Sequence, residues 1–224
     1  RFKEQANDAW AIGKALQVDA IVTGSVRQAG GQLRVIVKLV DTRTEANLWT
    51  KTFDKAAGDV FAIQREIAQS VAEGLSIELD AGYETRLAER QPDNLEAYNL
   101  YLKGRALWNT RTKENMTAAI ADFELALAKD PGFALAHVGI ADCYSMLAAY
   151  GHSPPIIAYP KAKKELQAAL KLNNGISEAH SSLGWVYYNF DWDWENGKRA
   201  FEEALRINPS NPEANYWYSQ LLMV

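Results

Sequence analysis

The sequence is poor in cysteine, has no long apolar run and carries no excess of basic residues. Its one cysteine, Cys143, excludes a disulfide within the chain and a zinc site built from cysteines. No apolar stretch reaches the ~18 residues that a membrane-spanning helix requires, so no membrane insertion is expected. Acidic residues outnumber basic ones by 28 to 24, and a basic face for nucleic acid is therefore not expected. With 48% hydrophobic and 23% charged residues, the composition is that of a folded globular protein.

The common sequence motifs of catalysis and cofactor binding are also missing. Gly24, Gly30 and Gly31 lie in a hairpin pattern, without the Gly-Lys-Ser/Thr of a phosphate-binding loop or a Gly-x-Gly-x-x-Gly fingerprint. The serines near His180 are not part of a Gly-x-Ser-x-Gly nucleophile elbow. We therefore predict no catalytic residue and no cofactor, and expect that this chain is not itself an enzyme.

The second half of the chain carries an internal repeat. A large residue is followed three positions later by alanine and then by an Asp-Pro, Asn-Asn or Asn-Pro pair; the large residues are Phe123, Leu166 and Phe201. A small residue with an aromatic or large residue three or four positions on precedes each of these; the small residues are Gly104, Ala141 and Gly184. The set resembles the tetratricopeptide repeat, whose unit is about 34 residues.

The repeat has a direct physical interpretation, because two antiparallel helices can approach closely only where one of them presents Gly or Ala. We predict consecutive helix hairpins over residues 95–131, 132–174 and 175–209, and the first helix of a fourth hairpin over 210–224. Extra residues in the second hairpin predict a longer exposed loop around residues 151–160, which contain three prolines. The third hairpin has one extra residue near Phe190.

The first half reads as a small α/β domain over residues 1–80, and residues 81–94 read as a linker. Helical spacing covers residues 7–16, and β-type patterns follow at 20–27, 33–40 and 47–53. In the middle strand, alternation places the side chains at positions 33, 35, 37 and 39 on one face. Asp59 is expected to cap a long second helix. The predicted fold class is α+β, with the sheet domain followed by an all-α tetratricopeptide-repeat solenoid.

Residues 18–26 (VDAIVTGSV), followed by Leu39-Val-Asp41 and residues 59–64 (DVFAIQ), resemble the TolB amino-terminal-like (FlgO-like) domain. One departure is Glu45, where that family usually has glycine. The resemblance implies a further strand and helix ahead of Arg1, and a chain that is part of a longer bacterial cytoplasmic protein. It also implies an attached output domain, often a class III adenylate or guanylate cyclase, otherwise a winged-helix DNA-binding domain of a transcriptional regulator, or sometimes a protein kinase.

The tetratricopeptide resemblance implies a concave groove formed by the first helix of each hairpin. Transferred by register, the predicted peptide- or protein-binding residues are Tyr98, Tyr101, Arg105, Trp108, Asp142, Ser145, Glu178, Ser181, Trp185, Tyr188 and Tyr216. Leu135, Val138, Glu213 and Gln220 fall in the same register. Exposed aromatic side chains beside an arginine suit the recognition of a peptide. The alternative is that Tyr98, Trp108 and Trp185 pack between helices.

Three functional hypotheses follow. The first is a non-catalytic interaction module that binds a protein, a peptide or the attached output domain, and that can form a homodimer. The second is an enzyme with a hydrolytic or metal site between the two halves. The third is a spacer without a ligand. The repeat pattern and the missing catalytic motifs favour the first.

Two further groups of residues have simple structural interpretations. His137 and His180 occupy equivalent positions in successive repeats, and we predict core packing in place of a metal site. In the Asp191-Trp192-Asp193-Trp194 stretch, the tryptophans are expected to fill the next repeat and the aspartates to cap a helix.

Overall fold

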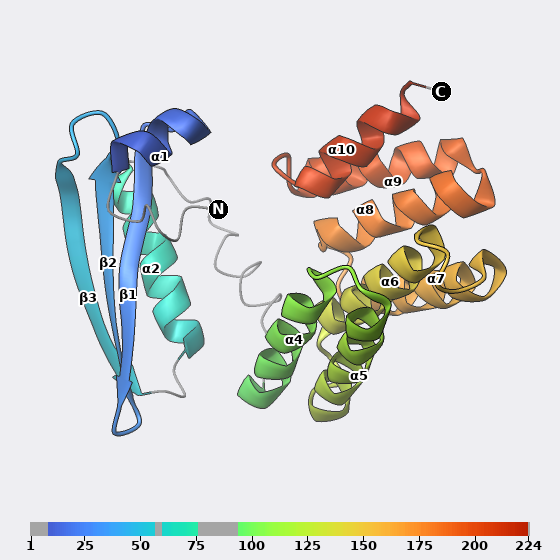
Figure 1. Ribbon diagram of the computed structural model, residues 1–224, viewed down its shortest axis with the longest axis horizontal. Coiled ribbons are helices and arrows are strands. Elements are labelled where there is room, and N and C mark those ends of the chain that lie inside the picture. Colours follow the sequence, from blue (N-terminus) through green and yellow to red (C-terminus); the bar gives the residue numbers. More distant parts are fainter. Residues whose placement is uncertain (1–8, 57–59, 76–93, 224) are drawn as a thin grey trace. The chain divides into compact units, whose positions relative to one another are not determined.

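A computed structural model describes residues 9–56, 60–75 and 94–223 of the chain (Figure 1). The chain divides into two compact units, Arg1–Leu87 and Ala88–Val224, each described by itself below. The predicted cap at Asp59 and the predicted linker, except for Asn94, lie outside the described residues.

The first unit contains a three-stranded antiparallel sheet with strand order β1-β2-β3. Its elements are α1 (Ala9–Leu16), β1 (Ala20–Ala29), β2 (Gln32–Asp41), β3 (Asn47–Ala56) and α2 (Val60–Gly74). The turn between β1 and β2 consists of Gly30 and Gly31, with φ angles of 56° and 75°. A two-residue hairpin turn of this hand needs positive φ at both positions, which glycine adopts without strain.

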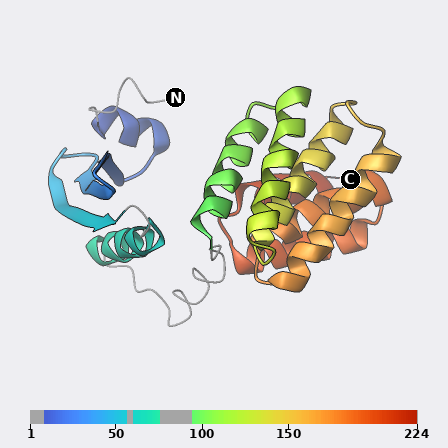
Figure 2. The ribbon, with the colours of Figure 1, turned by 90° about the horizontal axis from the view of Figure 1, so that it is seen from below.

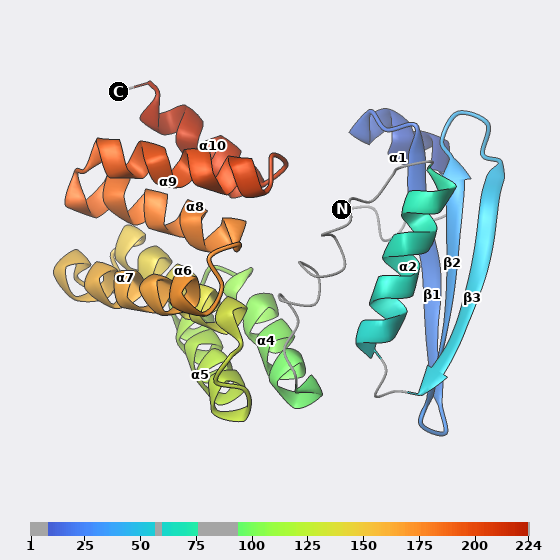
Figure 3. The same ribbon diagram turned by 180° about the vertical axis from the view of Figure 1, so that it is seen from behind.

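The core of the first unit lies between the sheet and α2, which runs along one face of the strands (Figures 2 and 3). Val37 and Leu39 on β2 are buried, as the alternation in the sequence predicts. Val37 packs with Phe53 of β3 and Ile63 of α2. The strand positions that share this face are therefore the ones that the period of two identified.

The second unit consists of consecutive antiparallel helix hairpins. Its helices are α4 (Leu95–Trp108), α5 (Lys113–Lys129), α6 (Ala134–Ala149), α7 (Pro155–Leu172), α8 (Ser177–Val186), α9 (Trp194–Ile207) and α10 (Pro212–Leu221). Contacts join α4 to α5, α6 to α7 and α8 to α9, and α10 packs on α9 and α8. The predicted fold class, a small sheet unit followed by helical hairpins, is confirmed. Among the described residues, no helix combines the length and hydropathy that crossing a bilayer demands.

The hairpins pack closely where aromatic side chains lie against glycines. Phe123 of α5 is fully buried between Gly104 of α4 and Gly139 of α6. A methyl group added at either glycine would lie 2.6 Å from a ring atom of Phe123. Phe201 lies against Gly184 in the same way, at 2.8 Å. In the first and third hairpins the repeat signature therefore marks glycine–aromatic contacts, and Gly139 is a further such position that the repeat comparison missed.

Each hairpin ends in the same local hydrogen bond. The side-chain oxygens of Asp130, Asn173 and Asn208 accept from the backbone N–H two residues later, at 3.0, 2.7 and 3.1 Å. A short polar side chain of this kind turns the backbone just after a helix end. The Asp and Asn residues of the repeat signature thus stop the second helix of each pair at a fixed point.

The predicted exposed loop around residues 151–160 is present only at residues 150–154, and the prediction is wrong for residues 155–160, which are helical. Only five residues separate α6 from α7, because α7 begins at Pro155 and contains Pro160. Pro155 suits the first position of the helix, where its missing N–H has no intrahelical partner. Pro160 lies inside α7, where its missing N–H removes one hydrogen bond of the helix. The extra residues of the second hairpin instead lengthen α7 to 18 residues.

The single extra residue of the third hairpin is absorbed in a π-helical turn, η1 (Tyr187–Asp191), that continues α8. This turn ends at Trp192, which has a φ of 57° and is 74% exposed. Trp194 is 47% exposed, so the prediction that both tryptophans fill the next repeat is wrong. Asp193 does cap α9, accepting from the Asn196 N–H at 3.1 Å. Asp191 is not a cap, since its carboxylate pairs with Lys163 of α7.

Candidate functional site

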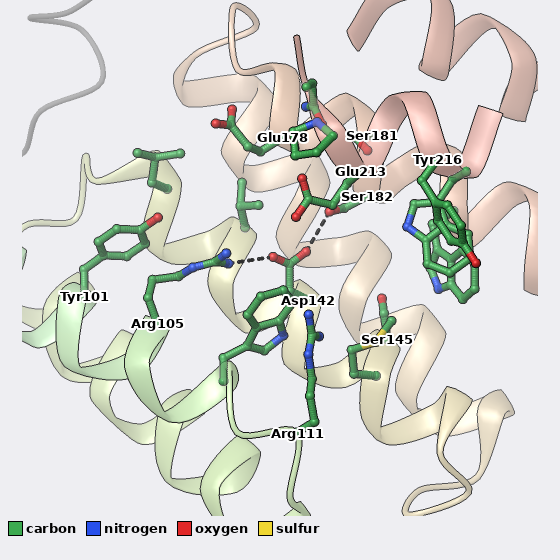
Figure 4. Close-up of a pocket in the computed structure, with 18 residues that line it drawn as sticks. Tyr101, Arg105, Arg111, Asp142, Ser145, Glu178, Ser181, Ser182, Glu213 and Tyr216 are labelled. Atoms are coloured by element: carbon green, nitrogen blue, oxygen red, sulfur yellow. Dashed lines mark hydrogen bonds and ion pairs between the residues drawn. The ribbon is translucent and has the colours of Figure 1, made fainter. Parts of the chain in front are cut away.

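The second unit contains a cavity of about 430 Å³ that is lined by α4, α6, α8 and α10 and by the turn after α4; it is called the α4–α10 cavity below (Figure 4). All of the predicted groove residues line it except Tyr98 and Tyr188. Those in its wall are Tyr101, Arg105, Trp108, Asp142, Ser145, Glu178, Ser181, Trp185 and Tyr216, together with Leu135, Val138 and Glu213. The register therefore brings residues from separate hairpins to one site, and their role in binding stays a prediction.

The two tyrosines outside the cavity wall support residues that belong to it. Tyr98 stacks on Tyr101, with ring centroids 6.4 Å apart. The ring of Tyr188 is 6.5 Å from that of Trp185. Gln220, which shares the predicted register, is not part of the wall either.

The cavity contains a charged network centred on Asp142 of α6. One carboxylate oxygen of Asp142 accepts from Arg105 of α4 at 3.0 Å, and the other accepts from Ser182 of α8 at 2.6 Å (Figure 4). Burial raises the pKa of Asp142 above its ordinary value and outweighs the opposing effects of Arg105 and Ser182. Burial by itself lowers the pKa of Arg105, but the charge of Asp142 outweighs this effect, and the pKa lies above its ordinary value. Arg105 therefore stays protonated. Arg105, Asp142 and Ser182 together link the three helices α4, α6 and α8 at the cavity wall.

A second arginine, Arg111, enters the cavity from the turn between α4 and α5. Its guanidinium lies 3.4 Å from the ring centroid of Trp108, and the guanidinium of Arg105 lies 4.2 Å from the same centroid. Trp108 thus makes cation–π contacts with both arginines. The register could not identify Arg111 because it belongs to the inserted turn residues, for which the repeat has no equivalent.

The far side of the cavity is aromatic. Trp185 of α8 and Trp217 of α10 lie with ring centroids 3.7 Å apart, and Tyr216 meets Trp217 edge-on at 4.6 Å. Trp217 is missing from the predicted set, although it directly follows the predicted Tyr216. Ser182, next to the predicted Ser181, is missing as well. Both residues were missed because the register selects only one residue per helical turn. Large aromatic surfaces of this kind contribute most of the affinity in many interfaces.

Several polar atoms of the cavity wall lack a hydrogen-bond partner within the described residues. Among them are Ser145 Oγ, Ser181 Oγ, Trp108 Nε1, Trp185 Nε1 and Arg111 Nη1. Both serines are 2% exposed. A buried donor without an acceptor costs free energy, so a concentration of such donors in one wall favours a bound acceptor group.

The two histidines have partners within the fold. His137 Nδ1 lies 2.6 Å from a Glu165 carboxylate oxygen, which joins α6 to α7. His180 is buried, and its Nε2 lies 2.9 Å from the carbonyl oxygen of Asn174. Among the described residues, no three or more His, Cys, Asp or Glu side chains are grouped as metal ligands would be. These contacts account for both imidazoles by packing and hydrogen bonding.

Comparisons with known proteins give one curated relative and a set of helical structures. No protein-family model matches the chain. A protein of Rhizobium meliloti (strain 1021) named "Putative adenylate cyclase 3" is 30% identical over 141 residues, which are 62% of this chain and 24% of that protein. The chain thus spans about a quarter of the length of this relative.

Two solved structures illustrate the structural similarity. One is the first TPR of Spaghetti (RPAP3) bound to the HSP90 peptide SRMEEVD, at 20% identity and a TM-score of 0.47, covering 59% of this chain and 94% of that one. The other is the Sgt2 TPR domain from Aspergillus fumigatus, at 19% identity and a TM-score of 0.48, covering 58% of this chain and 79% of that one.

Proposed function

We propose that the helical unit is a non-catalytic interaction module that binds a peptide segment in the α4–α10 cavity. The cavity itself carries this proposal, because four helices bring aromatic rings and a few polar groups to one concave site. Tyr216 in its wall is 57% exposed, and large exposed aromatic side chains in a concave site are typical of binding surfaces. The partner is a segment of another protein or of an attached output domain.

We further propose that this module is the regulatory part of a bacterial signalling protein, a class III adenylate cyclase, and that it acts in the cytoplasm. The similarity to a protein named as an adenylate cyclase supports this assignment. In this proposal, occupation of the cavity changes the output of the attached catalytic domain.

Binding is tested by panning a phage library of random peptides against the chain and measuring the affinity of the enriched peptides by fluorescence polarisation. Tyr216→Ala is expected to weaken binding at least tenfold, since the change removes an aromatic wall of the cavity. Trp192→Ala is the matched control, because Trp192 is exposed on the turn before α9 and does not line the cavity. Enriched peptides that bind the Tyr216 variant as tightly as the wild type would contradict the proposal, as would a failure to enrich any sequence.

The signalling assignment is tested on the full-length protein by measuring the formation of cyclic AMP from ATP. We expect cyclase activity in the wild type and a changed rate in Tyr216→Ala, with Trp192→Ala behaving as the wild type. Absence of activity in the wild type would refute the cyclase assignment. Equal rates in the wild type and the Tyr216 variant would refute the regulatory role of the cavity.

A further inference from the structure

Arg111 is the arginine of the cavity wall that has no acidic partner among the described residues. Arg105 pairs with Asp142 at 3.0 Å. The Arg111 guanidinium stacks on Trp108, and within the described part of the chain its side chain forms neither a hydrogen bond nor an ion pair. A half-buried cation without a counter-charge is unfavourable, and it favours the approach of an anion.

The cavity wall to which Arg111 belongs contains further hydrogen-bond donors that lack acceptors. Ser145 Oγ and Trp108 Nε1 are buried and without a partner among the described residues, as is Arg111 Nη1. The acceptor oxygens of the neighbouring Asp142 are already taken by Arg105 and Ser182. An incoming carboxylate would supply the acceptor that this side of the cavity lacks.

The backbone places Arg111 before any partner binds. Its φ of 59° lies in the left-handed region, which is costly for a residue other than glycine. Hydrogen bonds hold the turn: Thr110 Oγ1 donates to the Leu107 carbonyl at 2.7 Å, and Asn115 Nδ2 donates to Thr110 Oγ1 at 2.9 Å. The turn therefore fixes the backbone of Arg111, and the stack on Trp108 holds its guanidinium, which together lower the entropy lost on binding.

We infer that Arg111, with Ser145 and Trp108, binds the side-chain carboxylate of an internal Asp or Glu in the peptide segment that occupies the cavity. This inference rests on the proposed function. Arg105 and Asp142 come from the helices and pair with each other, and the charge of Glu213 in the same wall acts on both of them. Arg111 instead reaches in from the turn at the edge of the cavity (Figure 4). A peptide that passes over the Arg105–Asp142 pair reaches Arg111 with a side chain. The planar guanidinium suits two parallel hydrogen bonds to a carboxylate.

The test uses three fluorescein-labelled octapeptide mixtures with randomised flanking positions. One has a fixed central Glu and blocked termini, the second has Gln in its place, and the third has the central Gln with a free C-terminal carboxylate. Against the wild type, the Glu mixture is expected to bind about tenfold more tightly than the other two, as expected for one charge-assisted hydrogen-bonded contact. A mixture with a free C-terminus that binds as tightly as the Glu mixture would overturn the internal side chain as the ligand.

Two variants and one control locate the effect. In Arg111→Gln the preference for Glu over Gln is expected to disappear, and in Arg111→Lys, which keeps the charge, part of it is expected to return. Arg199→Gln is the matched control, because Arg199 is exposed on α9 and does not line the cavity. If the Gln variant does not fold, as judged by circular dichroism, the Lys variant still tests the inference. Its preference for the Glu mixture over the Gln mixture must then be smaller than that of the wild type but greater than zero. A full preference for Glu in either folded Arg111 variant would overturn the inference.

The outcomes separate this inference from the proposed function. Peptides that bind the wild type and are lost in Tyr216→Ala, but show no preference for Glu, refute the role of Arg111 and leave peptide binding intact. If the peptide mixtures bind the Tyr216→Ala variant with the same affinity as the wild type, peptide binding in the cavity itself is refuted.

Discussion

Replacing Gly139 with alanine tests the glycine–aromatic contacts that hold the hairpins together. Alanine in the interior of a helix is favoured over glycine by roughly 0.5–1 kcal/mol, so an open position would gain stability. At Gly139 the added methyl would lie 2.6–2.8 Å from three atoms of the buried Phe123 ring. Phe123 cannot move away, since Gly104 of α4 contacts its other side. Overpacking of this kind costs about 1–3 kcal/mol, which leaves a net loss of about 1 kcal/mol.

The change is measured by urea unfolding followed by far-ultraviolet circular dichroism. With a slope near 2 kcal/mol per molar urea, the midpoint of the variant is expected to fall by about 0.5 M. Gly197→Ala in α9 is the matched control, because its added methyl meets the flexible Leu221 side chain at 3.2 Å. We expect its midpoint to stay level or rise.

A double-mutant cycle assigns the loss to Phe123. Combining Gly139→Ala with Phe123→Leu is expected to show a favourable coupling of at least about 0.5 kcal/mol, because the smaller side chain makes room for the methyl. Equal stability of the Gly139 variant and the wild type would refute the idea that the small residues of the repeat set the distance between helices. Strictly additive effects of the two changes would assign the loss to another contact.

Three further predictions concern single residues. Burial raises the pKa of Asp142, so the folded state holds the carboxyl proton of Asp142 more tightly than the unfolded state does. The contribution of Asp142 to stability therefore falls as pH rises from about 4 through the folded pKa. The unfolding free energy of the wild type minus that of Asp142→Asn is therefore expected to decrease between about pH 4 and 7 in urea titrations, and an increase would contradict the prediction. Cys143 is fully buried and burial raises the pKa of its thiol, so Ellman's reagent should label it only after urea is added; rapid labelling of the folded protein would contradict this. Trp192→Gly should raise the free energy of unfolding by up to about 1 kcal/mol, and with it the thermal midpoint, because glycine adopts a φ of 57° without strain and the side chain that is lost is exposed. Trp194→Gly, at the first residue of α9, should lower the midpoint. A lower midpoint for the Trp192 variant would refute the strain.

Patterns that repeat over short distances were sufficient to predict most of the architecture. The alternation from Leu33 to Leu39 identified the buried face of β2, because side chains in a strand alternate between faces. Gly104 and Gly184 were identified as close-contact positions, because only small residues let paired helices approach. Where residues were inserted, the prediction failed: the prolines at 155 and 160 were expected to mark a loop, although Pro155 in the first turn is compatible with a helix and α7 continues through Pro160.

The candidate site was predicted only where the repeat register extends to it. Register selected Arg105, Asp142 and Trp185 on separate hairpins, and the structure brings all three to one cavity. It could not show that Arg105 and Asp142 neutralise each other, because their pairing depends on the distance between α4 and α6. Nor could it select Arg111 in the inserted turn.

The sequence by itself thus determined the kind of element at most positions, two close-contact glycines of the repeat and the face of each first helix that carries aromatic and charged residues. These properties follow from the local spacing of side chains along one strand or helix. Only the tertiary structure decided that Arg105 is paired and Arg111 is not, and that Phe123 lies between two glycines. Hydrogen bonds and ring contacts act over 3–4 Å, and distances on that scale between residues far apart in the chain are set by how the helices stack.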